Sequence, residues 1–343
     1  MKKISFIGPV CQGSPPTDGE TAKNQVIYTY LTEKYGSIYL VDTFYWKRDV
    51  KTFLKLLYVL YFKQSDYIVL SICTLSAYHL TRILFYSRVR KKLFYFVIGN
   101  TIVQGIEKKK YNPRYYSIYD KIFVEGKITQ KKMTEFNLNN VEYLPNFKNI
   151  DNDLLKIKKI NIKENDRVSF VFLSRITEDK GVSLIFKAVK QLNTLGLSSQ
   201  FTVSFYGPVA DDYKNVFIEK IGNTDNANYN GYLNLQEQKG YETLASYHVM
   251  LFPTFWEGEG FPGIIVDAFI AGLPVIASDW NLNKEIIIDG QTGIIVPARS
   301  INELTNAMIY FIQNKDRINE MSKFSRANAL KYHVNNLLDK KLL

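Results

Sequence analysis

The chain has 343 residues, of which 46% are hydrophobic and 14% aromatic. This length exceeds one comfortable hydrophobic core and predicts two domains, and this composition excludes an intrinsically disordered protein. Only Cys11 and Cys73 occur, which excludes a disulfide framework and favours a reducing compartment. No apolar run approaches the length of a membrane-spanning helix, so we expect a soluble or peripheral protein.

The positive charge is concentrated in the first half of the chain. Residues 1–150 hold 23 Lys and Arg against 11 Asp and Glu, a net charge of +12, whereas the remainder holds 21 against 22, or −1. The first half therefore favours an anionic partner, such as a membrane surface, a lipid-linked phosphate or nucleic acid. No nucleic-acid-binding module is recognisable, so we expect no nucleic-acid partner.

Two predicted helices of this half, Lys47–Phe62 and Ser76–Lys91, mix aromatic residues with basic ones. Basic amphipathic helices of this kind fit the interface of an anionic membrane. A core helix with a solvated basic face is the alternative for each helix alone. Combined with the charge asymmetry, the pattern favours peripheral membrane contact.

The first half reads as alternating strands and helices. We expect strands at Ile4–Gly8, Ile38–Val41, Tyr67–Ile72, Leu93–Ile98 and Lys121–Val124, with a first helix from Thr21 to Tyr35. Apolar strands separated by helices predict a doubly wound α/β domain with a parallel sheet, here over residues 1–150. Ligands of such domains bind at the carboxyl edge of the sheet.

The second half repeats this pattern after a polar stretch, Lys148–Asp166, which we take as the domain boundary. Strands are expected at Val168–Ser174, Phe201–Gly207 and Asn230–Leu233, and helices near Asp212–Ile221 and Gln236–Tyr247. The second domain is then residues 151–331. Between its first strand and first helix lies R-I-T-E-D-K-G, where Arg175 and Lys180 can converge on one anion at the helix start.

Residues 248–297 read as strand, acidic glycine-rich loop, helix, strand, short helix and strand. Tight turning and a helix start are provided by Gly260, Pro262 and Gly263. Free N–H groups at this helix start, flanked by Glu259 and Asp267, suit a ligand that is part anion and part polyol. An acidic surface loop capped by a core helix is the alternative.

The pattern E-G-F-P-G-x-x-x-D-A-x-x-A-G-x-P-V-I resembles the signature of family-4 retaining glycosyltransferases. The resemblance implies the GT-B fold, with two Rossmann-like domains facing each other across a cleft, and a C-terminal helix at about 332–343 that packs back on the first domain. The family's second acid is Glu. Here it is Asp267, so contact with a ribose requires a backbone shift or a bridging water.

The resemblance also implies roles for residues of the second domain. Arg175 and Lys180 bind the nucleotide diphosphate, Glu259 orients the hydroxyls of the donor sugar, and Asp267 holds the ribose. Further donor-binding positions are Gly260, Phe261, Pro262, Gly263, Gly207, Gly231, Tyr232 and Glu285. For Glu285, helix capping is an alternative.

In the first domain, G-E-T-A-K-N-Q resembles the glycine loop of exopolysaccharide-type members. It implies that Gly19, Glu20 and Lys23 face the cleft, although a flexible loop with a solvated helix start is equally open. The V-I-G-N turn implies a contact of Asn100 with substrate hydroxyls. Many members carry a histidine in this domain, but His79 matches no motif and reads as a packed or surface residue.

Taken together, the resemblance implies a retaining hexosyl- or N-acetylhexosaminyltransferase that takes a UDP-linked sugar as co-substrate and needs no cofactor or metal. The acceptor is a lipid-linked saccharide or an oligosaccharide in bacterial capsule, O-antigen or exopolysaccharide synthesis. We therefore expect a cytoplasmic protein on the inner face of the cell membrane. Alternatives are a catalytically silent nucleotide-sugar-binding module that supports a partner enzyme, and a phosphorylase or epimerase on the same fold.

Overall fold

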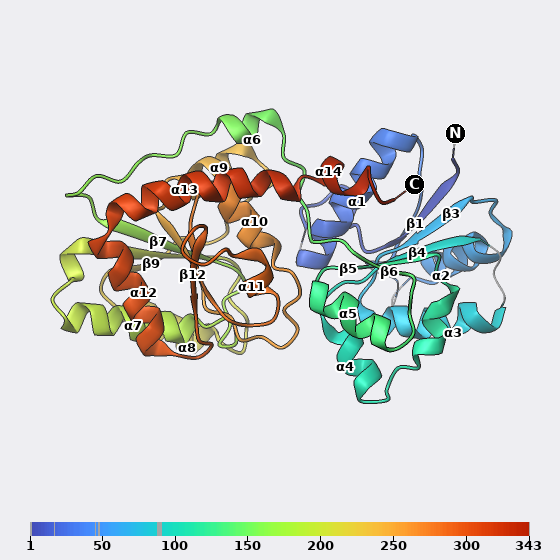
Figure 1. Ribbon diagram of the computed structural model, residues 1–343, viewed down its shortest axis with the longest axis horizontal. Coiled ribbons are helices and arrows are strands. Elements are labelled where there is room, and N and C mark those ends of the chain that lie inside the picture. Colours follow the sequence, from blue (N-terminus) through green and yellow to red (C-terminus); the bar gives the residue numbers. More distant parts are fainter. Residues whose placement is uncertain (1, 17, 45, 47–48, 88–90, 343) are drawn as a thin grey trace. The chain divides into compact units, whose positions relative to one another are not determined.

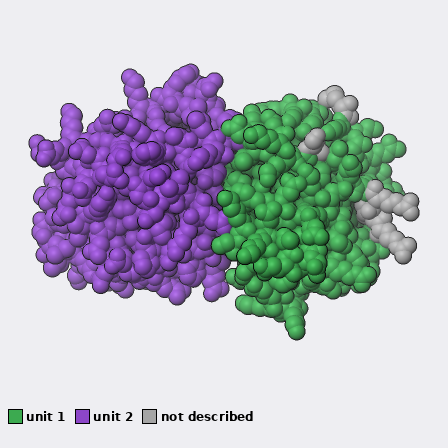
Figure 2. Space-filling view, in the orientation of Figure 1, with its two compact units in different colours: residues 1–149, 334–343 green, residues 150–333 purple. Residues whose placement is uncertain are grey.

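The computed structural model of the protein describes residues 2–16, 18–44, 46, 49–87 and 91–342. The chain forms two compact units, coloured separately in Figure 2. Unit 1 comprises Met1–Asn149 and Val334–Leu343, and unit 2 comprises Ile150–His333. Each unit is built on one six-stranded sheet in which all strand pairs are parallel (Figure 1). The predicted fold class, two doubly wound α/β domains, is confirmed.

The sheet of unit 1 has the strand order β2-β1-β3-β4-β5-β6. Its strands are β1 (Ile4–Gly8), β2 (Tyr39–Asp42), β3 (Tyr67–Leu70), β4 (Lys92–Phe96), β5 (Lys121–Val124) and β6 (Val141–Tyr143). Its α-helices are α1 (Gly19–Tyr35), α2 (Val50–Leu57), α3 (Thr74–Ser87), α4 (Thr101–Glu107), α5 (Lys127–Glu135) and α14 (Val334–Leu338). A π-helical turn at Tyr58–Phe62 extends α2, and a 3₁₀ turn covers Pro113–Ile118. Of the two predicted basic helices, positions 47–48 and 88–90 lie outside the described residues.

Both faces of this sheet are covered by helices. Alternate residues of a strand point to opposite faces, so they enter two different cores. In β4, Phe94 and Phe96 join the core under α1 and α14, whereas Leu93 and Tyr95 join the core under α2, α3 and α4. This explains why the strands read as continuous apolar runs in the sequence.

The last residues of the chain complete one of these cores. Val334, Leu338 and Leu342 are buried among side chains of α1 and the sheet of unit 1. The segment is fixed at its start by a hydrogen bond of 2.9 Å from Val334 N to Lys148 O. Unit 1 is therefore assembled from both ends of the chain, with α14 beside α1 (Figure 1).

The sheet of unit 2 has the strand order β12-β11-β10-β7-β8-β9. Its strands are β7 (Val168–Leu173), β8 (Phe201–Tyr206), β9 (Ala227–Tyr229), β10 (Val249–Phe252), β11 (Val275–Ser278) and β12 (Gly293–Val296). Its α-helices are α6 (Asn152–Lys156), α7 (Val182–Thr194), α8 (Lys214–Gly222), α9 (Gln238–Ala245), α10 (Gly263–Ile270), α11 (Asn283–Ile286), α12 (Ile301–Gln313) and α13 (Lys315–Ala329). Short 3₁₀ turns cover Ser198–Gln200 and Leu330–Tyr332. β10 lies directly beside β7, which brings the loops that follow these two strands to one edge.

One sequence expectation needs correction in this unit. The strand expected at Asn230–Leu233 is wrong: the strand is Ala227–Tyr229, and Gly231 has a φ of 72°, which a strand does not accommodate. The polar stretch Lys148–Asp166, taken as the domain boundary, contains the division between the two units, which falls between Asn149 and Ile150. Four of its apolar residues, Ile150, Leu154, Ile157 and Ile162, are buried in the cores of unit 2, whereas Leu155 and Ile160 are exposed.

No helix within the described ranges is long and apolar enough to cross a bilayer.

The burial of α14 predicts that a cavity in its packing destabilises unit 1 but not unit 2. Leu338 is fully buried, so we expect Leu338→Ala to lower the free energy of unfolding of unit 1 by about 2–5 kcal/mol. Hydrogen–deuterium exchange should quicken in β1 and β4 and stay unchanged in β10, which provides an internal control. The matched surface change Lys340→Ala should leave both units unaffected. Unchanged exchange in β4 of the Leu338→Ala variant would contradict this assignment.

Candidate functional site

Two loops of unit 2 meet at the carboxyl edge of its sheet. One follows β7 and carries Arg175 and Lys180; the other follows β10 and carries Glu259. Gly181 allows their close approach, because a Cβ at this position would lie 2.2 Å from Pro253 O and its φ is 81°. A glycine at this point of the sequence is therefore required by the packing of the two loops.

A buried ion pair joins the two loops. Lys180 Nζ lies 2.5 Å from Glu259 Oε2, and the two residues are only 5% and 6% exposed. The hydroxyl of Thr254 donates a second hydrogen bond of 3.1 Å to the same Glu259 oxygen. Burying two charges costs solvation, which this short contact and the extra donor offset only in part. The arrangement therefore indicates a functional use of the pair.

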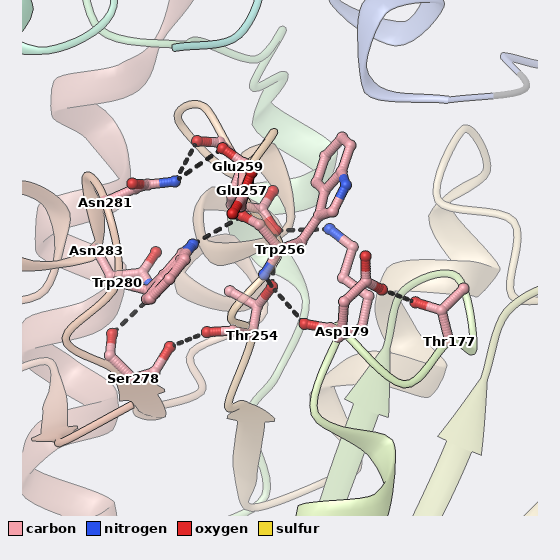
Figure 3. A network of polar contacts seen from close by, with 11 residues as sticks. Thr177, Asp179, Thr254, Trp256, Glu257, Glu259, Ser278, Trp280, Asn281 and Asn283 are labelled. Carbon is pink, nitrogen blue, oxygen red and sulfur yellow. Dashed lines mark hydrogen bonds and ion pairs between the residues drawn. The ribbon is translucent and has the colours of Figure 1, made fainter. Parts of the chain in front are cut away.

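Thr254 connects this pair to the rest of the edge. The backbone N–H of Phe255 donates to Asp179 O at 2.8 Å, and Thr254 O accepts a hydrogen bond from the hydroxyl of Ser278. Figure 3 shows the contact of Thr254 with Ser278, with Asp179 and Thr177 on one side of the loop and Trp280 and Asn281 on the other. The loop after β10 is thus held from both neighbouring loops.

Trp280 and Asn281, in the loop after β11, bind the acidic loop through its backbone. Trp280 Nε1 donates to Trp256 O at 2.7 Å, and Asn281 Nδ2 donates to Glu259 O at 2.9 Å. Asn281 has a φ of 45°, a left-handed conformation that asparagine tolerates better than most residues. These contacts fix the path of the loop while leaving the Glu259 carboxylate to Lys180 and Thr254.

The indole of Trp256 lies against both cations of the site. Lys180 Nζ is 4.5 Å and Arg175 Cζ is 5.3 Å from the ring centroid. Each such contact is worth about 0.5–2 kcal/mol, depending on solvent exposure. Lys180 is buried, whereas Arg175 is exposed, so the guanidinium is available to an incoming anion.

Around α10, the predicted donor-binding residues divide into two groups. Pro262 precedes the helix and Gly263 is its first residue, so the N–H groups at its start lie at the carboxyl edge beside the ion pair. Gly260 is half-buried in the loop, but the Phe261 side chain points into the core, with its ring 5.5 Å from that of Tyr332. Only the backbone of Phe261 can therefore take part in binding.

Asp267 lies inside unit 2, with an exposure of 3%. Its Oδ1 accepts a hydrogen bond of 2.5 Å from the hydroxyl of Tyr241 on α9. Burial, followed by the nearby Asp267 charge, raises the pKa of Tyr241, which keeps this phenol protonated as a donor. The shorter acid is thus engaged by a neighbouring helix.

The remaining predicted donor positions lie after β8, after β9 and in α11. Gly207 has a φ of 128°, and a Cβ there would lie 1.9 Å from Ser174 O, so β7 and β8 approach too closely for any other residue. Gly231 accepts a hydrogen bond of 2.8 Å from Gly207 N, and the side chain of Tyr232 is exposed. Glu285 is half-buried in the short helix α11.

In unit 1, the glycine-loop residues are also near a carboxyl edge but do not all reach solvent. Gly19 is exposed, whereas Lys23 is 4% exposed and forms a 2.7 Å ion pair with Glu125, which follows β5. Lys23 is therefore not a solvated cation at the helix start, because its ammonium pairs with a buried carboxylate. Glu20 is half-buried, and burial, reinforced by the charge of Asp18, raises the pKa of Glu20 to about 7.

Asn100 and His248 are held by hydrogen bonds within their own units, whereas His79 is a surface residue. Asn100 is the N-cap residue of α4 without a side-chain capping hydrogen bond, and its Oδ1 accepts a hydrogen bond of 2.8 Å from the hydroxyl of Thr129. His79 is exposed on α3, as expected for a surface residue. His248 Nδ1 lies 2.9 Å from Ser169 N, and burial, helped by the charge of Lys159, lowers the pKa of His248 to about 4.

Sequence reasoning missed Thr254, Trp256, Asn281 and Tyr241. Trp256 and Thr254 lie within residues 248–297, so their closeness to Glu259 along the chain is visible in the sequence. The contact of Trp256 with Lys180 is not, because it depends on the pairing of β7 with β10. Tyr241 offered no signal, because a tyrosine in a predicted helix reads as a core residue.

Chemically, the edge combines two cations, a carboxylate and a helix start. Cations held in place before a reaction stabilise an anionic leaving group without reorganisation. The carboxylate is an acceptor for hydroxyl groups. In the part of the chain that the structure describes, no three His, Cys, Asp or Glu side chains gather as a metal site would require.

Comparison with known proteins identifies relatives of the chain. The family model for glycosyl transferases group 1 matches residues 154–328. An uncharacterised 41.2 kDa protein in the cps region of Klebsiella pneumoniae is 30% identical over 157 residues, which cover 45% of this chain and 40% of that protein. The alpha-D-kanosaminyltransferase of Streptomyces kanamyceticus is 26% identical over 144 residues, 42% of this chain and 36% of that protein. The alignments thus span about two fifths of these relatives.

Solved structures resemble the whole chain. Anabaena Alr3699/HepE in complex with UDP has a TM-score of 0.68 at 14% identity, with 98% of both chains covered. The apo form of the lipopolysaccharide outer core galactosyltransferase WaaB has a TM-score of 0.70 at 14% identity, covering 98% of this chain and 97% of that one. At this identity the likeness establishes the fold, which is that of GT-B glycosyltransferases.

The buried ion pair predicts strongly unequal costs of substitution. Lys180→Met leaves the Glu259 carboxylate buried without its cation and should lower the free energy of unfolding of unit 2 by about 3–5 kcal/mol. Combining Lys180→Met with Glu259→Leu should cost less than Lys180→Met alone, because no unpaired charge remains. Urea denaturation of each variant measures these values.

The exposed pair of Lys156 with Asp153 is the matched control. Its side chains are 75% and 67% exposed, so Lys156→Met should change stability by about 0.5 kcal/mol or less. Equal losses for Lys180→Met and the double variant would contradict the buried-pair account.

Proposed function

We propose that this chain, which belongs to the group 1 glycosyl transferases, moves a sugar from a nucleotide-sugar donor to a saccharide acceptor and retains the configuration of the anomeric carbon. The observation that carries the proposal is the convergence of Arg175, Lys180 and Glu259 at one edge of unit 2. These groups match the two halves of such a donor, a diphosphate and a polyol.

In the proposed reaction, the bond between the anomeric carbon and the diphosphate oxygen breaks, and a bond to the acceptor oxygen forms on the same face. The acceptor hydroxyl gives its proton to the departing phosphate oxygen. Arg175 and Lys180 stabilise the charge that develops on the diphosphate, aided by N–H groups at the start of α10. Glu259 orients the sugar hydroxyls, and shares Lys180 with the diphosphate in the bound state.

We further propose that these side chains supply the positive charge themselves, so that neither metal nor cofactor is needed. The donor is a UDP-linked hexose or N-acetylhexosamine. Support for uridine comes from Anabaena HepE, which was solved with UDP and with UDP-glucose. Gly207, Gly231 and Tyr232 would hold the base, and Asp267 would reach the ribose through a bridging water while remaining bound to Tyr241. Glu285 would contribute from α11.

We place the acceptor with unit 1, where Gly19, Glu20 and Asn100 lie at the carboxyl edge of the sheet. A lipid-linked saccharide or oligosaccharide in bacterial capsule or O-antigen synthesis fits the relative encoded in a Klebsiella cps region. The protein would then work in the cytoplasm, on the inner face of the cell membrane.

Peripheral contact with an anionic membrane is supported by the surface of α2 and the turn that follows it. This helix exposes apolar side chains at helical spacing, with Val50 at 73%, Leu54 at 58% and Phe62 at 75% exposure. The exposed cations Lys51 and Lys55 lie on the same helix. Apolar side chains that enter the interface beside lysines that attract anionic lipids form an interfacial helix.

The proposed catalytic charge predicts a selective loss of rate. Arg175→Ala should lower kcat/KM for the donor about 10²–10³-fold, because a preorganised donor to the leaving group is lost, while thermal stability stays close to wild type. Arg167→Ala is the matched control, since Arg167 is exposed at the opposite end of β7. The assay follows UDP release, and NMR of the product reports the anomeric configuration.

Three results would contradict the proposal. Wild-type turnover by Arg175→Ala would remove the leaving-group role. An inverted product would remove the retaining mechanism. Specific nucleotide-sugar binding with no transfer to any acceptor would favour the silent-module alternative.

Membrane contact predicts a combined effect of apolar and basic residues. In flotation with vesicles containing anionic lipid, Leu54→Ser with Phe62→Ser should weaken binding about tenfold or more, because buried apolar area is lost. Val216→Ser with Ile218→Ser on α8 of unit 2, also exposed, is the control. Unchanged flotation of the α2 variant would refute this docking surface.

A further inference from the structure

Trp256 holds an unusual position among the groups of the donor edge. Its ring is the shared neighbour of Lys180 and Arg175, at 4.5 Å and 5.3 Å from the centroid. The two cations come from the loop after β7, whereas the indole comes from the loop after β10. A single aromatic side chain therefore spans the two loops that carry the charged groups.

The backbone of Trp256 is fixed on both sides. Its N–H donates to Thr254 Oγ1 at 3.3 Å, and its carbonyl oxygen accepts from Trp280 Nε1 at 2.7 Å and from Glu259 N at 3.1 Å. The indole extends on the opposite side of the loop from that of Trp280 (Figure 3). The indole that contacts the cations is thus attached to a backbone whose conformation is fixed by hydrogen bonds.

Gly258 makes room for the ring. A Cβ at position 258 would lie 2.6 Å from an atom of the Trp256 indole, and the backbone there does not have a positive φ. Glycine is therefore required at this position by the indole and not by the turn. In the sequence W-E-G, Trp256 provides the indole and Gly258 leaves the space that it occupies.

The indole differs from a carboxylate in how it holds these charges. Lys180 already has Glu259 as its counter-ion, whereas among the described residues no carboxylate pairs with Arg175. A second carboxylate would neutralise the guanidinium and repel a diphosphate. The face of an aromatic ring attracts a cation without adding net negative charge, so the Arg175 guanidinium stays available to an anion beside Lys180.

We propose that Trp256 is a positioning residue for the diphosphate: its indole holds the Arg175 guanidinium beside the Lys180 ammonium, so that both meet one anionic ligand. The inference rests on the proposed function, because it takes the ligand to be a nucleoside diphosphate. Trp256 would act on the diphosphate only through Arg175 and Lys180. Its indole would not contact the uracil base.

The test compares ligands with and without phosphate. We expect Trp256→Leu, which keeps an apolar side chain but loses the aromatic face, to bind UDP about 2- to 30-fold more weakly, the range to which a cation–π contact corresponds. Trp256→Phe keeps an aromatic face and should lose less. Uridine, which lacks phosphate, should bind all three proteins equally, and calorimetry measures each affinity.

A second variant keeps the tryptophan and moves it. Gly258→Ala places a methyl group against the indole and should weaken UDP binding, as Trp256→Leu does, again without an effect on uridine.

Two of the three tryptophans of the chain, Trp256 and Trp280, lie in this site. UDP should therefore change the intrinsic fluorescence of the wild type and change it less in Trp256→Phe. Phe324→Leu, an exposed aromatic residue of α13, is the matched control.

The outcomes separate this proposal from the function on which it rests. Equal UDP affinity of the wild type and Trp256→Leu overturns the positioning role while leaving nucleotide binding intact. Parallel losses for UDP and uridine also overturn it, because the indole would then contact the nucleoside. If the folded wild type binds neither UDP nor inorganic pyrophosphate, the proposed function fails and the role of Trp256 fails with it.

Discussion

The ion pair of Lys180 with Glu259 is the interaction on which the donor edge of unit 2 depends. It connects the loops after β7 and β10 through one contact of 2.5 Å that is almost wholly withdrawn from water. Its environment is built by residues with little choice of identity, because Gly181 must let Pro253 approach and Thr254 must donate to the carboxylate. Burial makes such a pair a poor source of stability but keeps two opposite charges in a defined place. That is what a site needs if it must meet both a diphosphate and a sugar.

Unit 1 also contains a buried ion pair between a lysine and a glutamate. Lys23, on the first helix after β1, pairs with Glu125 after β5 at 2.7 Å, and both residues are buried. In each unit, a lysine that follows the first strand is paired with a carboxylate that follows a later strand. The difference lies around the pairs: an exposed arginine and an indole accompany Lys180, whereas Lys23 is near the ring of Phe147 at 5.8 Å. Within the described part of the chain, only the pair of unit 2 thus has a neighbouring exposed cation that shares an aromatic ring with its lysine.

The sequence predicted the fold class because strand and helix periods were clear, and it selected the loops after β7 and β10 because their charged residues lie in a recognisable pattern. It failed where contacts depend on three-dimensional packing. The pairing of Lys23 with Glu125 could not be predicted, because the distant Glu125 gives no local signal. Phe261 read as part of a binding loop, although its ring enters the core. The strand expected at Asn230–Leu233 failed because the positive φ of Gly231 is a property of the turn and not of the apolar pattern. The roles assigned to the site residues remain proposals, since position alone does not establish what they bind.

The most direct test of the account is a crystal structure of the protein with UDP. We expect diphosphate oxygens within hydrogen-bonding distance of both Arg175 and Lys180, at the start of α10, with the Lys180 ammonium shared between Glu259 and the phosphate. UDP bound elsewhere, or a diphosphate that leaves both cations uncontacted, would contradict the central claim that this edge of unit 2 is the donor site.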